Sequence, residues 1–274
     1  RHFAGLDPRV RYSRNPVDLG AAANFNLVFA RSTSRFFKWA AHDDVLEPRF
    51  LERCLEVLDS DPSTVLAYSK IRRIDAAGEV TGTCDIARRF DAGRPHQRWA
   101  ALIRRHPCVS VFGVVRSEAL RRTRGLGPYV ASDLCLLAEL GLAGKIFEIP
   151  EYLFRRRDHP DTSCRKMADP TERIAWFDPR RQGRIVLPEW RLAWEYAKTV
   201  FRVPLPAGER VRCLAHLARF CSERRRWLVM NVLAAARAAT DRVPLARNLV
   251  SAGLAAGRRV GLRPWAIVRG VDPL

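Results

Sequence analysis

A short apolar run that ends in two carboxylates is the feature that most restricts how this chain can fold. Residues 36–41 read Phe-Phe-Lys-Trp-Ala-Ala, and Asp43 and Asp44 follow after one residue. Such aromatic-rich runs are typical of buried strands, and open α/β sheets bind ligands beyond the carboxyl ends of their strands. Adjacent carboxylates there suit a hard divalent cation that bridges to phosphates. The alternative is that both aspartates cap a helix that begins near Pro48.

The chain is strongly basic, but its charge does not select one partner. Its 274 residues carry a net charge of +19, and only five of the 48 basic residues are lysine. A basic surface attracts nucleic acid, nucleotide diphosphates and anionic lipid alike. Hydrophobic residues make up 47% of the chain, which excludes a mainly disordered protein. No apolar run approaches the roughly 20 residues that span a bilayer.

Several familiar site types are absent from the sequence. The seven cysteines are scattered, their number is odd, and no C-x-x-C pair occurs, so neither a structural zinc site nor a disulfide framework is expected. They are predicted to be small buried side chains in a reducing compartment. The chain also contains no P-loop, no Gly-x-Gly-x-x-Gly and no Gly-x-Ser-x-Gly elbow.

Apolar periodicity predicts alternating strands and helices up to about residue 165, the pattern of an α/β layered domain. Helices are expected at 21–30, 50–58, 99–105 and 134–142. Strands are expected at 10–12, 36–41, 65–68, 109–115 and 146–149, the last closed by Pro150. Further along, three basic amphipathic helices are predicted at 190–201, 209–221 and 227–239, followed by a frayed tail at 240–274. The predicted domains are residues 1–165 and 166–274.

Four segments occur in a recognisable order. Asn15 is followed by Leu19-Gly20-Ala-Ala-Ala-Asn24-Phe25-Asn26, then by Phe37 to Leu51 with Ala41-His42-Asp43-Asp44 inside it. Residues 131–140 and 148–159 complete the series. This order resembles bacterial family 2 glycosyltransferases with a GT-A fold, over roughly residues 7–165. The resemblance implies an α/β fold with a Rossmann-like mixed sheet flanked by helices, followed here by the basic helical region.

The sequence departs from that family pattern in two ways. The family begins with a strand and an apolar-Pro-x-Tyr-Asn segment, then a second strand, which together hold the nucleotide base. Neither precedes residue 1 here, so we expect an N-terminally truncated domain whose activity as a fragment is open. The family's Asp-x-Asp is replaced by Ala41-His42-Asp43, so its first carboxylate is lost.

The resemblance assigns a metal site to the acidic segment. Asp43 aligns best with the carboxylate that binds Mg²⁺ or Mn²⁺, and the ion would bridge both phosphates of a nucleotide-sugar donor. Asp44 either shares the ion or contacts the substrate, and His42 is assigned to the substrate. His159, after the closing strand, is a further metal or phosphate contact. The alternative for His159 is an ordinary loop histidine bonded to backbone.

Other residues are expected to contact the donor. Asn15, Gly20 and Asn24 are predicted to line its side of the site, because a glycine at a helix opening lets backbone approach a phosphate or ribose. For Asn15 the alternative is turn chemistry around Asn-Pro. Arg156 is the predicted diphosphate contact within the triplet 155–157, of which one or two members are expected to be solvated.

Asp133 is the expected general base, on the resemblance of residues 131–140 to the family's catalytic segment. An inverting transfer needs a carboxylate to accept the proton of the attacking hydroxyl. The alternative is that Asp133 caps the helix at 134–142, which is worth about 1 kcal/mol. The two roles are compatible. At the helix N-terminus, the dipole is expected to lower the pKa of Asp133.

The sequence therefore predicts an inverting, metal-dependent glycosyltransferase that moves a sugar from a UDP- or GDP-linked donor to a cell-surface glycan or lipid-linked acceptor. The alternatives are a basic module that binds nucleic acid or anionic lipid without catalysis, and a glycosyltransferase relative inactivated by truncation. No nucleic-acid motif is recognised. The expected location is the cytoplasm, at the inner membrane face if the C-terminal helices contact lipid. An apolar face formed by Leu214, Leu217, Cys221, Leu228 and Val232 serves either that contact or packing onto the α/β domain.

Overall fold

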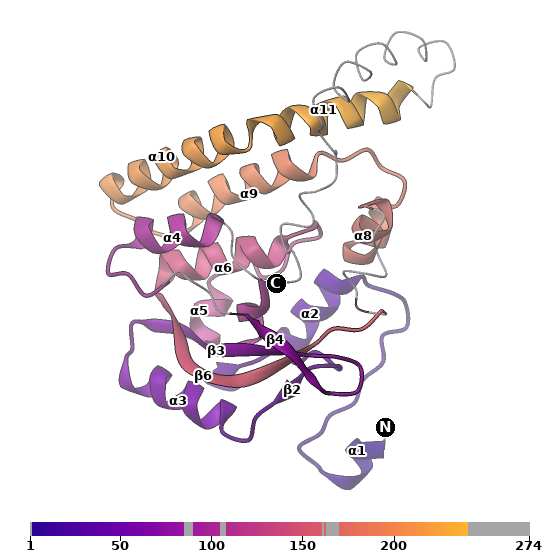
Figure 1. The fold of residues 1–274 in the computed structure, drawn as a ribbon, viewed down its shortest axis with the longest axis vertical. Coiled ribbons are helices and arrows are strands. Elements are labelled where there is room, and N and C mark those ends of the chain that lie inside the picture. Colours follow the sequence, from indigo (N-terminus) through magenta and orange to yellow (C-terminus); the bar gives the residue numbers. More distant parts are fainter. Residues whose placement is uncertain (1, 85–89, 105–107, 161, 163–169, 241–274) are drawn as a thin grey trace.

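The computed structural model of the chain describes residues 2–84, 90–104, 108–160, 162 and 170–240 (Figure 1). In this part of the chain, six strands form a single mixed sheet with helices on both of its faces. The strand order is β1-β5-β3-β6-β2, and β4 also pairs with β3. The predicted α/β fold with a mixed sheet and a helical C-terminal region is confirmed.

Two long strands form the centre of the sheet. The strands are β1 (Phe36–Phe37), β2 (Val45–Leu46), β3 (Thr64–Ile74), β4 (Val80–Cys84), β5 (Val114–Arg116) and β6 (Lys145–Arg157). β3 and β6 run parallel, and the other described pairs are antiparallel. β3 is buried for most of its length because it pairs along both edges and carries helices on both faces. Such strands read as continuous apolar runs.

Helices make up the rest of the described fold. They are α1 (His2–Leu6), α2 (Ala21–Ala30), α3 (Phe50–Ser60), α4 (Pro95–Ile103), α5 (Ser117–Arg121), α6 (Ser132–Ala143), α8 (Pro170–Phe177), α9 (Pro188–Arg202), α10 (Ala207–Glu223) and α11 (Arg225–Thr240), with 3₁₀ turns η1 (Cys108–Phe112) and η2 (Pro179–Arg181). The predicted helices at 21–30 and 50–58 and the three C-terminal helices are confirmed. α4 begins four residues earlier than expected, and α8 was not predicted.

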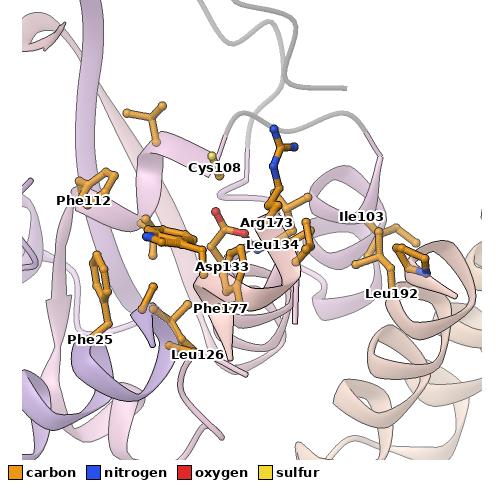
Figure 2. Close-up of a pocket in the computed structure, with 18 of the residues that line it drawn as sticks. Phe25, Ile103, Cys108, Phe112, Leu126, Asp133, Leu134, Arg173, Phe177 and Leu192 are labelled. Atoms are coloured by element: carbon orange, nitrogen blue, oxygen red, sulfur yellow. Dashed lines mark hydrogen bonds between the residues drawn. The ribbon is translucent and has the colours of Figure 1, made fainter. Parts of the chain in front are cut away.

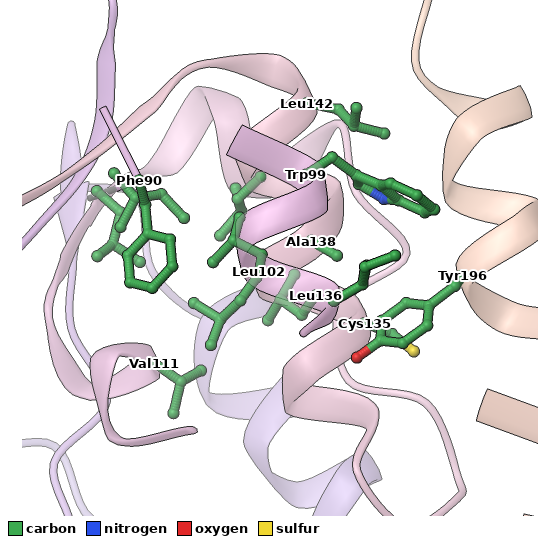
Figure 3. Close-up of a cluster of buried hydrophobic side chains, with 14 of the residues drawn as sticks. Phe90, Trp99, Leu102, Val111, Cys135, Leu136, Ala138, Leu142 and Tyr196 are labelled. Carbon is green, nitrogen blue, oxygen red and sulfur yellow. The ribbon is translucent and has the colours of Figure 1, made fainter. Parts of the chain in front are cut away.

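The two faces of the sheet bury separate clusters of apolar side chains. Phe50, Cys54 and Leu58 on one face of α3 pack against Ala67 and its neighbours in the sheet. On the other face, α4 and α6 contribute a larger cluster that includes Trp99, Leu102, Leu136, Leu137 and Ile146 (Figure 3). The alternation of β3 side chains explains the division, because Leu66 and Tyr68 belong to the larger cluster and Ala67 to the smaller.

Helices α9 and α10 continue this larger cluster. Leu192, Tyr196 and Val200 of α9 and Cys213 and Phe220 of α10 are buried in it. The predicted apolar face of 209–221 therefore covers the α/β region, since Leu214, Leu217 and Cys221 pack against the same core. Of the α11 residues assigned to that face, Leu228 is buried and Val232 is exposed. The division at residue 165 stays a prediction, but the core extends across it.

Several predicted strands are wrong. Residues 10–12 form no strand, the run 36–41 is strand only at Phe36–Phe37, and 109–115 is mostly the turn η1. β6 does not stop at Pro150 but continues through it to Arg157. The pairing with β3 shifts register between the pairs Ser69–Ile149 and Lys70–Tyr152, so the proline, which lacks an amide hydrogen, falls in an irregular stretch of the ladder. The predicted tail lies outside the described residues beyond Thr240.

The cysteines of the described residues are partly buried, and one helix criterion bears on the membrane. Six cysteines there are free thiols, four of them buried, and Cys164 lies outside the described residues. Burial raises the pKa of the Cys54 thiol to about 12, so it is an inert apolar side chain at neutral pH. Among the described helices, none has the length and hydropathy needed to cross a membrane.

Candidate active site

A cavity of about 620 Å³ lies between the sheet, the N-terminus of α6 and the C-terminal helices. Its walls come from α2, residues 41–44, η1, the start of α6, the end of β6 and helices α8 to α11. Asp43, Asp44, Asp133 and Arg156 all line it. Segments more than a hundred residues apart in sequence therefore meet in one cavity.

Strand pairing explains how the acidic segment reaches the end of β6. β2 pairs antiparallel with β6, with Val45 opposite Arg155 and Leu46 opposite Phe154. The two residues before Val45 therefore run past the last two residues of β6. The backbone amide of Arg157 donates to Asp44 Oδ1 at 3.0 Å, and Arg157 Nε donates to the Asp43 carbonyl at 2.9 Å. The acidic turn is thus fixed by the sheet.

His159 lies beside Asp43. Its Nε2 atom is 3.1 Å from Asp43 Oδ2, and both side chains are about one-fifth exposed. His159 therefore bonds a side chain here rather than backbone, but it is not among the residues that line the cavity, and its role as a metal or phosphate contact stays a prediction. His42 points elsewhere: its side chain is 93% exposed, and its Nδ1 is 3.9 Å from Asp43 Oδ1.

The surroundings of Asp44 change the pKa of its carboxyl group. Burial raises its pKa above the ordinary value, and the nearby charge of Asp43 raises it further. The Arg157 amide and the charges of Arg156 and Lys38 act in the opposite direction but do not cancel the effect. A cation bound at this place would relieve the repulsion between the two carboxylates.

The side chains near Asp43 fit a divalent ion that has only two protein ligands. Among the described residues, no group of three or more His, Cys, Asp or Glu side chains is arranged to hold a metal. Asp43 with His159, or with Asp44, offers two protein ligands. Mg²⁺ in phosphate-transfer sites commonly takes one or two carboxylates and fills its remaining positions with substrate phosphates and water, and imidazole suits Mn²⁺ better than it suits Mg²⁺. The residues thus fit an ion that arrives with a diphosphate.

The three arginines at the end of β6 have different surroundings. Arg155 Nε donates to Glu47 at 2.6 Å, and the Arg157 guanidinium donates to the carbonyls of Asp43, Asp75 and Ala76. Arg156 makes no side-chain hydrogen bond or ion pair within the described part of the chain, and it lines the cavity near Asp44. Arg156 therefore differs from its two neighbours, and its role as a diphosphate contact stays a prediction.

Asp133 lies in the middle of the cavity wall (Figure 2). It stands between the side that Phe25 and Phe112 form and the side that Ile103 and Leu192 form. The residue is not the helix cap: α6 begins at Ser132, its N-cap is Ala131, and Asp133 Oδ1 accepts the amide of Leu134 at 2.9 Å. The predicted capping position is therefore wrong by two residues.

The pKa of Asp133 also differs from the expectation. Burial among apolar side chains raises it, and this outweighs the lowering by the Leu134 amide and by the Cys108 thiol. Any lowering of the Asp133 pKa by the helix N-terminus is therefore smaller than the raising by burial. Ala131 has φ +64°, the only positive φ of a non-glycine residue in the described ranges. Left-handed backbone in such a residue costs on the order of 1 kcal/mol and is found preferentially at functional sites.

The residues predicted for the donor side are placed differently. Asn15 Nδ2 donates to Asn24 Oδ1 at 2.9 Å near the surface, and neither residue lines the cavity. Gly20 has φ +76°, and a Cβ atom there would lie 2.7 Å from Pro179 Cδ and 2.8 Å from the Phe177 carbonyl oxygen. Its close approach is therefore to the segment after α8. Ala21 and Ala22 of the same helix do face the cavity.

The sequence analysis missed the helical wall of the cavity. α8 contributes Arg173, Trp176 and Phe177, and α9 to α11 contribute Leu192, Tyr196, Phe220 and Trp227. The amphipathic faces of 190–201 and 209–221 were recognised, but periodicity alone does not show which buried residues border a space. α8 is short, and it was not predicted although Asp169-Pro170-Thr-Glu172 carries the residues of a helix start signal.

Comparison with known proteins agrees with the fold. No curated protein matches the chain. Residues 1–123 match the family model described as glycosyl transferase family 2. The match includes the acidic segment at 43–44 and ends before Asp133 and His159, whose placement rests on the structure. The mixed sheet with its flanking helices is consistent with a GT-A domain, and together with this match it supports a glycosyltransferase.

Proposed function

We propose that this protein is an inverting, divalent-metal-dependent glycosyltransferase that transfers a sugar from a UDP- or GDP-linked donor to a glycan or lipid-linked acceptor of the cell envelope. The observation that carries the proposal is the single cavity lined by Asp43, Asp44, Arg156 and Asp133. Two carboxylates and a free guanidinium suit a metal diphosphate, and a third carboxylate apart from them suits proton transfer.

The end of β6 and the acidic turn form the donor end. Asp43, with His159 or Asp44, would hold Mg²⁺ or Mn²⁺, and the bound ion would supply Lewis-acid stabilisation of the diphosphate leaving group. Arg156 is positioned to pair with a phosphate oxygen. Arg157 orients the turn, because its backbone amide and its side chain both bond to residues 43 and 44.

Asp133 performs the proton transfer. The acceptor hydroxyl oxygen forms a bond to the anomeric carbon while the bond from that carbon to the diphosphate oxygen breaks. The hydroxyl proton passes to Asp133, and the nucleoside diphosphate departs. A raised pKa makes Asp133 a better proton acceptor than an ordinary aspartate while leaving it ionised above that pKa. Attack from the face opposite the diphosphate inverts the anomeric configuration.

The test is donor turnover with and without the metal. UDP- and GDP-sugars are incubated with the protein in Mn²⁺, Mg²⁺ or chelator, and released nucleoside diphosphate is measured. We expect metal-dependent release that falls at least about a hundredfold in Asp43→Ala. Asp59→Ala is the matched control, since Asp59 pairs with Arg35 at the surface and does not line the cavity. Equal release by wild type and Asp43→Ala would contradict the proposal.

No observation in the described residues favours the basic-module alternative. Several basic side chains of α9, of α10 and of the residue after α10 are paired with carboxylates: Arg202 with Glu195, Arg212 with Glu209, and Arg224 with Glu189. Paired charges contribute less to a field that would attract a polyanion. Duplex DNA titrations at several salt concentrations check this, and we expect no tight binding with a steep salt dependence.

A further inference from the structure

The cavity has chemically different ends. The charged groups Asp43, Asp44 and Arg156 come from the acidic turn and the end of β6. The helical end is formed by Ile103 of α4 with Leu192, Tyr196, Phe220 and Trp227 of α9 to α11. These four helices pack against one another, so their side chains form one wall. Asp133 lies between Phe25 on one side and Leu192 on the other (Figure 2).

Four charged residues that line the helical end, on α9 and α10 and directly after α4 and α10, lie in two pairs. Glu189 and Arg224 form an ion pair at 2.9 Å, and Arg104 lies 4.0 Å from Glu223. The wall between these pairs is aromatic and aliphatic. Hydrocarbon placed against this wall would be removed from water without burying polar groups that lack partners. The apolar part of the helical end therefore suits hydrocarbon.

We propose that the acceptor is an amphiphile, in which the hydroxyl-bearing group lies at Asp133 and an attached hydrocarbon chain lies against Leu192, Phe220 and Trp227. This rests on the function proposed above and specifies its acceptor as lipid-linked. Each methylene removed from water contributes about fourfold to affinity, so a short stretch of chain in the helical end provides much of the binding.

Binding of an amphiphile can be measured without turnover. Decyl maltoside, kept below its critical micelle concentration, is titrated into the protein by calorimetry, and maltose serves as the head-group control. We expect decyl maltoside to bind with a negative heat-capacity change, the signature of apolar burial, and maltose to bind at least about tenfold more weakly.

Three variants test where the hydrocarbon chain of decyl maltoside binds. Trp227→Ala removes an aromatic side chain from the cavity wall and so enlarges the cavity. Leu192→Phe adds apolar volume and so makes the cavity smaller. Each is expected to weaken decyl maltoside binding about tenfold or more. Trp194→Ala is the matched control, because Trp194 is also on α9 but is 59% exposed and outside the cavity. Circular dichroism confirms that each variant is folded.

The results separate this inference from the function it rests on. Unchanged decyl maltoside affinity in both folded variants, equal weakening in Trp194→Ala, or equal affinity for maltose overturns the inference. Metal-dependent donor turnover would then still support a glycosyltransferase with a different acceptor. Conversely, decyl maltoside binding that depends on Trp227 and Leu192 supports the apolar site even if no sugar nucleotide is consumed. In that case only the proposed sugar-nucleotide donor is contradicted.

Discussion

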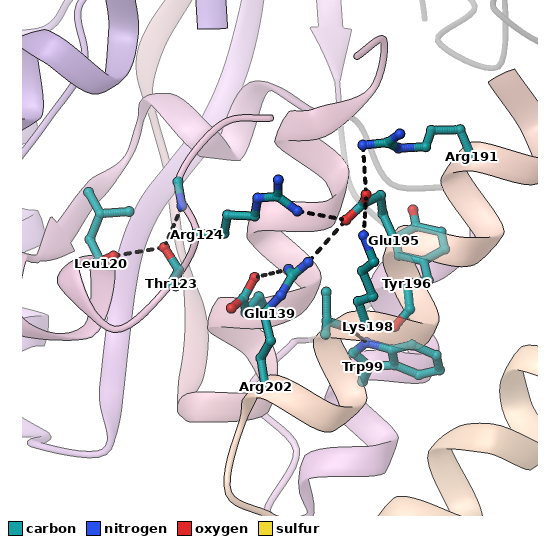
Figure 4. Close-up of polar contacts among 12 residues, drawn as sticks. Trp99, Leu120, Thr123, Arg124, Glu139, Arg191, Glu195, Tyr196, Lys198 and Arg202 are labelled. Carbon is teal, nitrogen blue, oxygen red and sulfur yellow. Dashed lines mark hydrogen bonds and ion pairs between the residues drawn. The ribbon is translucent and has the colours of Figure 1, made fainter. Parts of the chain in front are cut away.

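Two acidic side chains, Asp133 on α6 and Glu195 on α9, show how surroundings decide the behaviour of a carboxylate removed from solvent. Glu195 of α9 is fully buried and lies within 3.1 Å of cationic atoms of Arg191, Lys198 and Arg202, with Arg124 at 3.7 Å (Figure 4). Burial alone would raise its pKa, but these hydrogen bonds and charges together lower it below the ordinary value. Within the described ranges, no cationic side chain forms an ion pair with Asp133, and burial raises its pKa.

The difference teaches that burial does not by itself mark a catalytic acid or base. Glu195 is held ionised by its partners, and the cluster ties α9 to α6 through Arg202, which also bonds Glu139 at 3.2 Å. Asp133 keeps an affinity for protons and opens into the cavity. Glu195 is therefore a structural carboxylate, and the arrangement at Asp133 suits the base assigned to it in the proposed reaction.

The largest expected effect is the loss of transfer activity when Asp133 is replaced. Asp133→Asn removes the proton acceptor and should lower transfer by about 10² to 10⁴-fold with donor affinity retained. Asp59→Asn, an isosteric change at an exposed carboxylate, should leave transfer unchanged. The measurement is product formation under saturating donor. Full transfer activity in Asp133→Asn would remove the base assignment.

The next effect is the loss of stability when Glu195 is replaced. Glu195→Ala leaves four cations around an empty space and should lower the free energy of unfolding by about 3 kcal/mol. Glu118→Ala is the control, because Glu118 and its partner Arg122 are both about three-quarters exposed, and the loss there should be within about 0.5 kcal/mol. Urea denaturation gives both values. Similar losses in the two variants would mean that the buried cluster does not stabilise the helix contact.

The pH dependence of stability should have opposite signs for the two carboxylates. The pKa of Glu195 is lowered, so its contribution is complete above the ordinary glutamate value and is lost as the pH falls through the lowered pKa. The pKa of Asp133 is raised, so stability falls as the pH rises from the ordinary aspartate value to the raised one. Asp133→Asn should abolish that fall. Melting temperatures of wild type and Asp133→Asn across pH check it; a constant difference would contradict the sign.

The smallest effect concerns the thiol beside Asp133. Cys108 lowers the pKa of Asp133, although less than burial raises it. Cys108→Ala should therefore shift the acid limb of the pH–rate profile toward higher pH, with the rate at high pH nearly unchanged. Cys221→Ala, at a half-buried thiol outside the cavity, should produce no shift. A shift toward lower pH in Cys108→Ala would show that the thiol acts in another way.

Local patterns predicted much of the fold. The i, i+3, i+4, i+7 spacing of α3 and the C-terminal amphipathic helices was sufficient to locate them, because their buried faces have helical periodicity. Short strands were harder. β1 and β2 have two residues each, and η1 has the apolar, β-branched composition of a strand. In these segments tertiary pairing decides the conformation, and single-sequence patterns carry little of that information.

The candidate site was predictable in its residues more than in its geometry. The order of motifs indicated Asp43, Asp133 and His159, and the structure places Asp43 beside His159 and Asp43 with Asp133 in one cavity. Sequence could not show that α6 begins at Ser132, that burial outweighs the helix dipole at Asp133, or that Gly20 packs on Phe177 and Pro179. Each depends on neighbours distant in the chain.

The span of the cavity wall has a consequence for biosynthesis. The wall runs from Ala21 to Trp227, so a ribosome must release most of the described chain before the chamber can close. Until then Asp43 and Asp133 lack the wall that α9 to α11 place across the cavity from the sheet. A nascent chain that has completed its sheet is therefore still without half of the cavity, which forms only when these helices have emerged and packed.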